Sequence, residues 1–146
     1  MNQTAAISYF KATPTSSIVN QVTLYSFDIN FLIKHFSGDR VLIKFPTEVI
    51  FYIKQVQISS VFDCASLTTN LTISCSKINS ETMQFILNYN SSIYSNQATI
   101  TVQNFTNNWY SSTRTFTVQT TTNDTSFYYQ EEGSSIVNYL PAKILC

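Results

Sequence analysis

Residues 63–76, with the sequence DCASLTTNLTISCS, hold the side chains best suited to chemistry in this chain. Cys64 and Cys75 bracket a Ser- and Thr-rich run, and the Asn-Leu-Thr triplet that begins at Asn70 is an acceptor for an N-linked glycan. A zinc site needs four clustered ligands, whereas only these two cysteines and His35 are on offer, without a Cys-x-x-Cys pair. A reactive thiol needs a cationic neighbour or a helix start, and neither is apparent around the two cysteines. We therefore expect no metal site.

The two cysteines are expected to pair with each other. A bridge between Cys64 and Cys75 closes a loop of about 12 residues and stabilises the fold by roughly 3 kcal/mol in the chain-entropy model. The alternative is two buried free thiols, because free cysteine is often a core residue. The chain has three cysteines, so this pairing leaves Cys146 over.

Acceptor triplets for N-linked glycans recur along the chain, beginning at Asn2, Asn70, Asn90, Asn104 and Asn123. In a chain so rich in Asn, Ser and Thr, about three or four triplets would arise by chance, so their position says more than their number. Asn90 and Asn123 fall in turn-like sequence, where a glycan has room. Asn70 lies between the cysteines and Asn104 ends a predicted strand. With the expected disulfide, these four sites favour an extracellular or cell-surface glycoprotein.

Catalytic groups are scarce. His35 is the only histidine, and its sequence context, IKHFSGD, predicts an ordinary loop residue. The alternative is a Ser-His-Asp group that forms in space with Asp28, Asp39 or Asp63. The glutamates at 131–132 are adjacent, so in a strand they point to opposite faces, which disfavours paired-carboxylate chemistry. The acidic residues do not have the spacing of a calcium loop. A hydrolase would need His35 beside a carboxylate and a hydroxyl in a cleft; we expect no catalytic residues and no cofactor.

Four aromatic residues are candidates for a contact surface: Trp109, Tyr110, Tyr128 and Tyr129. Such rings stack on sugar faces or anchor protein interfaces. The alternative is that they belong to the core or its rim. An adhesin-like module that recognises carbohydrate or a partner protein would group these four rings on one exposed patch.

Composition limits the class of protein. The 146 residues suit one domain, and a hydrophobic content of 44% excludes disorder. Charged residues make up only 11% and the formal net charge is zero, so there is no basic surface for nucleic acid or an anionic membrane. No apolar run approaches the ~20 residues of a membrane span. The first residues lack the basic and apolar regions of a signal peptide, so we expect a segment of a larger precursor.

Alternation of apolar and polar residues predicts β-strands through most of the chain. In QATITVQNF, residues 97–105, Ala98, Ile100 and Val102 face one way. The same pattern places Phe116 and Val118 inward. It recurs in YSFDINFLI, where Tyr25, Phe27, Ile29, Phe31 and Ile33 share a face. Further strands are expected at 40–45, 48–58, 71–76, 82–89 and 134–140. Roughly eight to ten short strands separated by turns predict an all-β fold, an immunoglobulin-like antiparallel sandwich.

The two ends of the chain have similar sequences. AAISYF, residues 5–10, and PAKILC, residues 141–146, both predict short strands that begin with small residues. This similarity fits a single domain over residues 1–140, with 141–146 as a terminal strand or the junction to a following repeat. Cys146 would then belong to the junction and not to the core.

The sequence GDRVLIKFPTEV, preceded by TLYSFDINF and followed by the cysteine-bracketed segment, resembles the repeated β-sandwich modules of large extracellular surface proteins of ciliates. The resemblance covers roughly the first half of the chain and rests on Tyr25, Phe27, Ile29, Ile43, Phe45, Pro46, Cys64 and Cys75. It implies an immunoglobulin-like fold with a disulfide loop, and no catalytic residues.

These observations give two hypotheses of different classes. The first is a non-catalytic structural module, one repeat of an extracellular glycoprotein or surface filament that is joined head to tail with like modules. A terminal strand of one module would complete the sheet of its neighbour. The alternative is the adhesin-like binding module described above, with the exposed aromatic rings as its contact surface.

Overall fold

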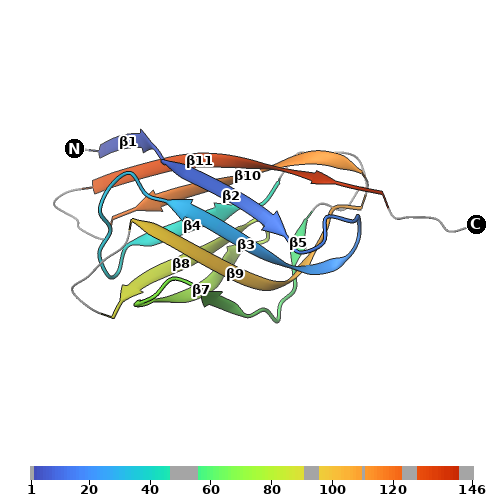
Figure 1. Ribbon diagram of the computed structural model, residues 1–146, viewed down its shortest axis with the longest axis horizontal. Helices are drawn as coiled ribbons and strands as arrows, with labels where there is room; N and C mark the ends of the chain where they lie inside the picture. Colours follow the sequence, from blue (N-terminus) through green and yellow to red (C-terminus); the bar gives the residue numbers. More distant parts are fainter. Residues whose placement is uncertain (1, 47–55, 91–95, 110, 123–127, 142–146) are drawn as a thin grey trace, which may run out of the picture.

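Two β-sheets packed face to face make up the computed structural model of the chain (Figure 1). It describes residues 2–46, 56–90, 96–109, 111–122 and 128–141, and within these ranges it has eleven strands and no helix. The strands are β1 (Asn2–Ala6), β2 (Tyr9–Pro14), β3 (Val22–Asn30), β4 (Arg40–Lys44), β5 (Gln57–Ile58), β6 (Cys64–Ser66), β7 (Leu71–Asn79), β8 (Thr82–Tyr89), β9 (Gln97–Thr106), β10 (Ser112–Thr121) and β11 (Tyr128–Tyr139). The predicted all-β sandwich is confirmed.

The larger sheet has the strand order β1-β11-β10-β4-β8-β7, and the smaller sheet has the order β2-β3-β9-β5, with β6 pairing to another stretch of β9. Neighbouring strands are antiparallel in every pair but one. The exception is β1, the first strand, which lies parallel to β11, the last. Because these two strands are parallel, β1 starts at the end of the molecule where β11 starts, and β11 finishes at the opposite end (Figure 1).

The core lies between the sheets and follows the predicted alternation. The inward positions of β9 and β10, Ala98, Ile100, Val102, Phe116 and Val118, are all buried. Aromatic rings fill the centre of the core, where the centroid of Phe27 lies 6.1 Å from those of Phe105 and Phe116. Ring pairs at such separations add roughly 0.5–1.5 kcal/mol each to the stabilisation from burial alone.

The face predicted over residues 25–33 ends earlier than expected. Tyr25, Phe27 and Ile29 are buried in β3, and Phe31 is buried just after it. Ile33 is only half-buried, because β3 ends at Asn30 and the chain turns into a loop there.

The N-terminal segment differs from the prediction of one strand over residues 5–10. The chain passes from the larger sheet to the smaller one at Ile7 and Ser8. The Ile7 amide still donates to the Glu132 carbonyl of β11, at 2.8 Å, whereas the Ser8 amide donates to the Asn30 carbonyl of β3, at 3.1 Å. This switch produces two strands instead of one. With the very short β5 and β6, it raises the number of strands above the predicted eight to ten.

Two other predicted strands can be compared only in part. Of the strand expected at 48–58, the structure describes residues 56–58, of which Gln57 and Ile58 form β5. Of residues 141–146 only Pro141 is described, so the predicted terminal strand and Cys146 lie outside the described residues. At the other end of the chain, β1 pairs with β11 of the same chain.

Gly133 permits the switch between sheets. A Cβ atom at this position of β11 would overlap the Cγ2 methyl group of Ile7 and would touch Val118. Because Ile7 is β-branched, its side chain has little rotamer freedom with which to move away. The absence of a side chain at Gly133 thus lets the crossing segment lie against β11.

Gly133→Val should therefore destabilise the protein by about 1–3 kcal/mol through overpacking, although valine normally favours strands. Urea denaturation measures the change. The matched control is Ser134→Val, because Ser134 is the next residue of β11 and is exposed. Equal free energies of unfolding for the two variants would show that the contact with Ile7 does not constrain this position.

Candidate functional site

The predicted disulfide is present between Cys64 and Cys75. Cys64 is in β6, on the edge of the smaller sheet, and Cys75 is in β7, on the edge of the larger one. The bridge therefore joins the two sheets along one side of the sandwich, while the β1–β2 crossing joins them along the other. Its place between two sheet edges indicates a structural bond.

The predicted glycan sites differ in their surroundings. Asn70 and Asn90 are both exposed and lie next to each other. The backbone amide of Asn90 donates to the backbone carbonyl of Asn70 at 2.8 Å. Asn104 is half-buried, and its side-chain amide donates to the Val61 carbonyl at 2.9 Å. Asn123 lies outside the described residues.

Backbone conformation gives a second reason why asparagine occurs at two of these positions. Asn70 and Asn104 have φ angles of 63° and 71°. Asparagine adopts this left-handed region more readily than most other residues. A structural role therefore explains the residue type at both positions whether or not a glycan is attached.

The four candidate aromatic residues do not form one patch. Trp109 lies three residues before Ser112, which pairs with Tyr139 at the end of β11. Tyr128 pairs with Asn2 at the start of β11. The distance along β11 from Tyr128 to Tyr139 is about 36 Å at 3.3 Å per residue. Tyr110 and the side chains of Tyr128 and Tyr129 lie outside the description, while Trp109 is exposed. The strand register puts Trp109 and Tyr128 at opposite ends of β11, so the expected single patch holding both is wrong.

The polar cluster that the sequence did not reveal surrounds His35. We call it the His35 cluster; it consists of His35, Asp39, Glu131 and Thr120. His35 Nδ1 lies 2.9 Å from Asp39 Oδ2, and His35 Nε2 lies 2.6 Å from Glu131 Oε1. The Thr120 hydroxyl donates to Glu131 Oε1 at 2.9 Å. All four side chains are buried, so the prediction of His35 as an ordinary loop residue was wrong about its surroundings.

The same carboxylates hold the backbone of the β3–β4 loop, residues 31–39. Glu131 Oε2 accepts hydrogen bonds from the amides of Leu32, at 2.5 Å, and Ile33, at 3.3 Å. Asp39 Oδ2 accepts one from the Phe36 amide at 2.9 Å. The loop is thus anchored to β11, a strand about 100 residues away in sequence.

The cluster favours the protonated form of His35 and the ionised form of Glu131. Burial alone lowers the pKa of His35, but hydrogen bonds and the charges of Asp39 and Glu131 outweigh it and raise that pKa above its ordinary value. Burial alone raises the pKa of Glu131, but hydrogen bonds from His35, Leu32 and Thr120 outweigh it and lower that pKa. In the protonated form, both nitrogens of His35 donate to carboxylates.

This arrangement does not fit nucleophilic catalysis. A catalytic histidine must accept a proton from a nucleophile, whereas both nitrogens of His35 face carboxylates, and the Thr120 hydroxyl bonds to Glu131. A depression of about 280 Å³ lies elsewhere, lined by Thr117, Val118, Gln119, Glu132 and Gly133. The chemistry of the His35 cluster is that of a buried ion-paired anchor.

A second buried network lies at the opposite end of β11. The Tyr25 hydroxyl lies 2.5 Å from Asn107 Oδ1 and 2.6 Å from the Tyr139 hydroxyl. The Asn107 amide donates to the carbonyls of Ser16 and Ile18, at 2.7 and 2.8 Å. Burial raises the pKa of the Tyr25 and Tyr139 hydroxyls, so both stay neutral. We call the group of Tyr25, Asn107 and Tyr139 the Tyr25 network. It fixes the β2–β3 connection as the His35 cluster fixes the β3–β4 loop.

The described residues contain no group of three or more His, Cys, Asp or Glu side chains arranged to hold a metal ion. No helix in the same residues is long and apolar enough to cross a membrane.

The protonation of His35 predicts how stability depends on pH. Its folded pKa lies above 6.5, so its contribution is complete below pH 6.5 and is lost as pH rises through the folded pKa. The folded pKa of Glu131 lies below 4.5, so its contribution is complete above pH 4.5 and is lost as pH falls through the folded pKa. Urea denaturation should therefore give the highest free energy of unfolding between about pH 4.5 and 6.5.

Because His35 is the only histidine, an NMR titration of its imidazole reports the folded pKa directly. A value at or below 6.5 would contradict the ion-paired cluster. The double variant His35→Gln, Glu131→Gln should weaken the pH dependence above pH 6.5. Glu132→Gln, which changes an exposed carboxylate of the same strand, should leave it unchanged.

Comparison by sequence gives no relatives: no protein-family model matches the chain, and no curated protein matches it. Solved structures do share its fold. A cohesin module from the family 33 glycoside hydrolase of Clostridium perfringens has a TM-score of 0.58 and 9% identity, covering 94% of this chain and 100% of that one.

Two further structures are similar. The collagen-binding subdomain of the Enterococcus faecalis surface protein ACE has a TM-score of 0.53 and 9% identity, covering 89% of this chain and 96% of that one. BslA, a bacterial hydrophobin, has a TM-score of 0.50 and 12% identity, covering 96% of this chain and 100% of that one. At such low identities the likeness concerns the fold alone, and this chain has the immunoglobulin-like sandwich fold of cohesin and adhesin domains.

Proposed function

We propose that this chain is a non-catalytic structural module of an extracellular surface protein, joined head to tail with like modules. The observation that carries the proposal is the parallel pairing of β1 with β11. Because of it, the chain enters the sandwich at one end and leaves at the other (Figure 1). Modules connected through such ends extend in a line, whereas termini at the same end would fold the array back on itself.

The buried polar groups support a structural role. The His35 cluster and the Tyr25 network both tie loops to the sheets. The neighbours in fold, a cohesin module and a collagen-binding subdomain of a surface protein, are consistent with a non-catalytic binding or structural module. The sequence resemblance to surface-protein repeats of ciliates supports the choice of a repeated structural unit.

The disulfide supports an extracellular location, because such bonds persist in oxidising compartments. We include N-linked glycans in this proposal. Asn70 and Asn90 are the better placed sites because both are exposed. Asn104 is the worse placed, because its amide nitrogen, the atom to which a glycan attaches, is held against the Val61 carbonyl.

The adhesin-like alternative rests on the fold of the collagen-binding subdomain and on the exposure of Trp109. The separation of the aromatic residues removes the single patch that this alternative required. We therefore favour the structural module.

Electron microscopy of the native material tests the linear assembly. We expect fibres with an axial repeat of about 40–50 Å, close to the length of one sandwich whose longest strand has twelve residues. The fibres should stay intact when glycosidases remove the glycans, because protein ends form the joints. Discrete particles of one or two modules would contradict the proposal.

Mass spectrometry of glycopeptides from the same material tests the acceptor sites. We expect glycans at Asn70 and Asn90 and an unmodified Asn104. Trypsin and a second protease should be used in parallel so that each site is observed in two peptides. Full occupancy of Asn104 with empty sites at Asn70 and Asn90 would show that exposure and amide bonding do not govern modification here.

A further inference from the structure

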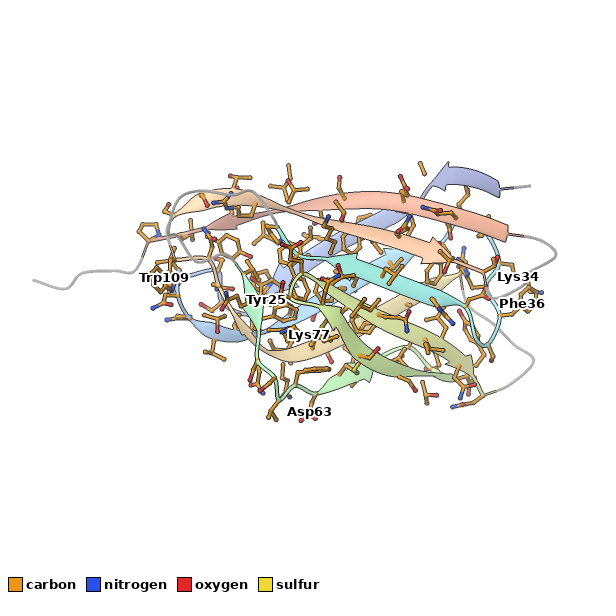
Figure 2. The ribbon with its side chains drawn as sticks, turned by 180° about the vertical axis from the view of Figure 1, so that it is seen from behind. Tyr25, Lys34, Phe36, Asp63, Lys77 and Trp109 are labelled. Atoms are coloured by element: carbon orange, nitrogen blue, oxygen red, sulfur yellow. A yellow bond between two sulfur atoms is a disulfide. The ribbon has the colours of Figure 1, made fainter. Side chains whose placement is uncertain are left out.

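Large apolar side chains are exposed at both ends of the long axis. At the end where β11 starts, the β3–β4 loop exposes Leu32 and Phe36, which are 59% and 60% accessible. We call these two residues and Lys34 the leading surface. Figure 2 places Phe36 and Lys34 at one end of the molecule and Trp109 at the other.

The opposite end carries a second apolar group, Val22, Trp109 and Leu140, with 66%, 46% and 54% of their surfaces accessible. We call it the trailing surface. Backbone hydrogen bonds bring the segments that hold these residues together: the Asn20 amide donates to the Asn108 carbonyl and the Val19 amide to the Leu140 carbonyl, both at 2.9 Å. The surface therefore draws on three parts of the chain.

The leading surface is held in place before any contact is made. The amides of Leu32 and Phe36 are bound by the carboxylates of Glu131 and Asp39, and Lys34 Nζ lies 5.3 Å from the centroid of the Phe36 ring. A loop fixed in this way loses little conformational entropy on binding. A connection without a contact role does not need two exposed apolar side chains on such an anchor.

The outer faces of β7 and β10, on the flanks of the sandwich, are polar and not apolar. The outward positions of β7 and β10 carry hydroxyl groups, from Thr72, Ser74, Ser76, Thr113, Thr115 and Thr117. Other exposed apolar residues, among them Leu67, Ile78 and Ile136, are spread over different strands and loops, as is normal for a protein surface. Contact through the ends therefore excludes more apolar surface from water than contact through the β7 and β10 faces.

We propose that the leading surface of one copy of this chain packs on the trailing surface of the next copy. Phe36 and Leu32 would lie against Val22 and Leu140, with Lys34 near the face of Trp109, where a cation is attracted by the ring. This inference rests on the head-to-tail function proposed above and names the contact that it uses. The two surfaces lie at opposite ends of one axis, so the contact is heterologous and repeats as an open line.

A second copy is the partner that fits, because every chain carries both the leading and the trailing surface. The leading surface lies where β11 starts and the trailing surface where it finishes, so successive copies would be joined in the direction of β11 (Figure 2). The formal net charge is zero, so copies do not repel one another over long distances. A contact through a narrow end buries less than the ~800 Å² per partner of a standard interface. Separate copies should therefore associate weakly, with a Kd on the order of 0.1–1 mM, whereas linked modules would meet at millimolar effective concentration.

The test uses sedimentation velocity and small-angle X-ray scattering of the full chain up to about 1 mM, the upper end of the expected Kd range. All proteins carry Cys146→Ser, so that an intermolecular disulfide does not imitate association. Phe36→Asp disables the leading surface and Trp109→Asp the trailing one, with Leu140→Asp as a second trailing variant. Ile136→Asp is the matched control, because Ile136 is 65% accessible on the outer face of β11. Circular dichroism confirms that each variant is folded.

The parent protein and Ile136→Asp should form species whose maximum dimension grows by one module length at a time. Phe36→Asp and Trp109→Asp should each stay monomeric alone. Mixed together they should form dimers and nothing larger, because the first keeps a working trailing surface and the second a working leading surface.

Three results would overturn the contact: a parent protein that stays monomeric at 1 mM, a mixture that stays monomeric, or a loss of association in Phe36→Asp alone, which would indicate a symmetric loop-to-loop dimer. Failure of this contact is distinguishable from failure of the proposed function. Native fibres together with any of these three results would leave the head-to-tail module standing and would place its joint elsewhere. Native material made of discrete particles would remove the function itself.

Discussion

The parallel pairing of β1 with β11 is the constraint on which the other features depend. It brings the first strand of the chain into the larger sheet, so the chain must cross to the smaller sheet before β2. The crossing presses Ile7 against β11, and that position is occupied by Gly133, which has no side chain to collide with it. The same pairing places the start of β1 and the end of β11 at opposite ends of the long axis (Figure 1).

The two sheets are connected covalently along both sides of the sandwich. On one side the continuous chain from β1 to β2 connects them, and on the other the disulfide from Cys64 to Cys75 does so. Sheet edges expose unpaired amides and carbonyls, and charged residues usually protect them. A chain with only 11% charged residues has few such residues to place there. Covalent connections across both sides limit how far its edges can open.

Each of the two buried polar networks fixes a different loop. The His35 cluster is charged, and removal of one partner from such a group typically costs about 3–5 kcal/mol, because the remaining charge stays buried. The Tyr25 network is neutral and ties the β2–β3 connection through Asn107. They lie towards opposite ends of β11, next to the two apolar surfaces. A rigid loop behind each surface suits the head-to-tail contact proposed above.

Alternation with a period of two predicted the fold class and the inward faces of most strands. The short separation of the two cysteines, 11 positions, favoured the disulfide that is present. The sequence also placed Glu131 and Glu132 on opposite faces, and the buried Glu131 confirms this. A charged residue on an inward face, together with a single histidine, was the signal for the His35 cluster. The sequence did not supply the distance between them, because 96 residues separate His35 from Glu131.

Tertiary packing determined which residues meet. It set the register that separates Trp109 from Tyr128, the switch of the N-terminal segment between sheets and the anchoring of the β3–β4 loop. The physical reason is the same in each case. Local pattern fixes the direction of a side chain relative to its own strand, whereas the order and register of strands follow from packing and hydrogen bonds between segments far apart in sequence.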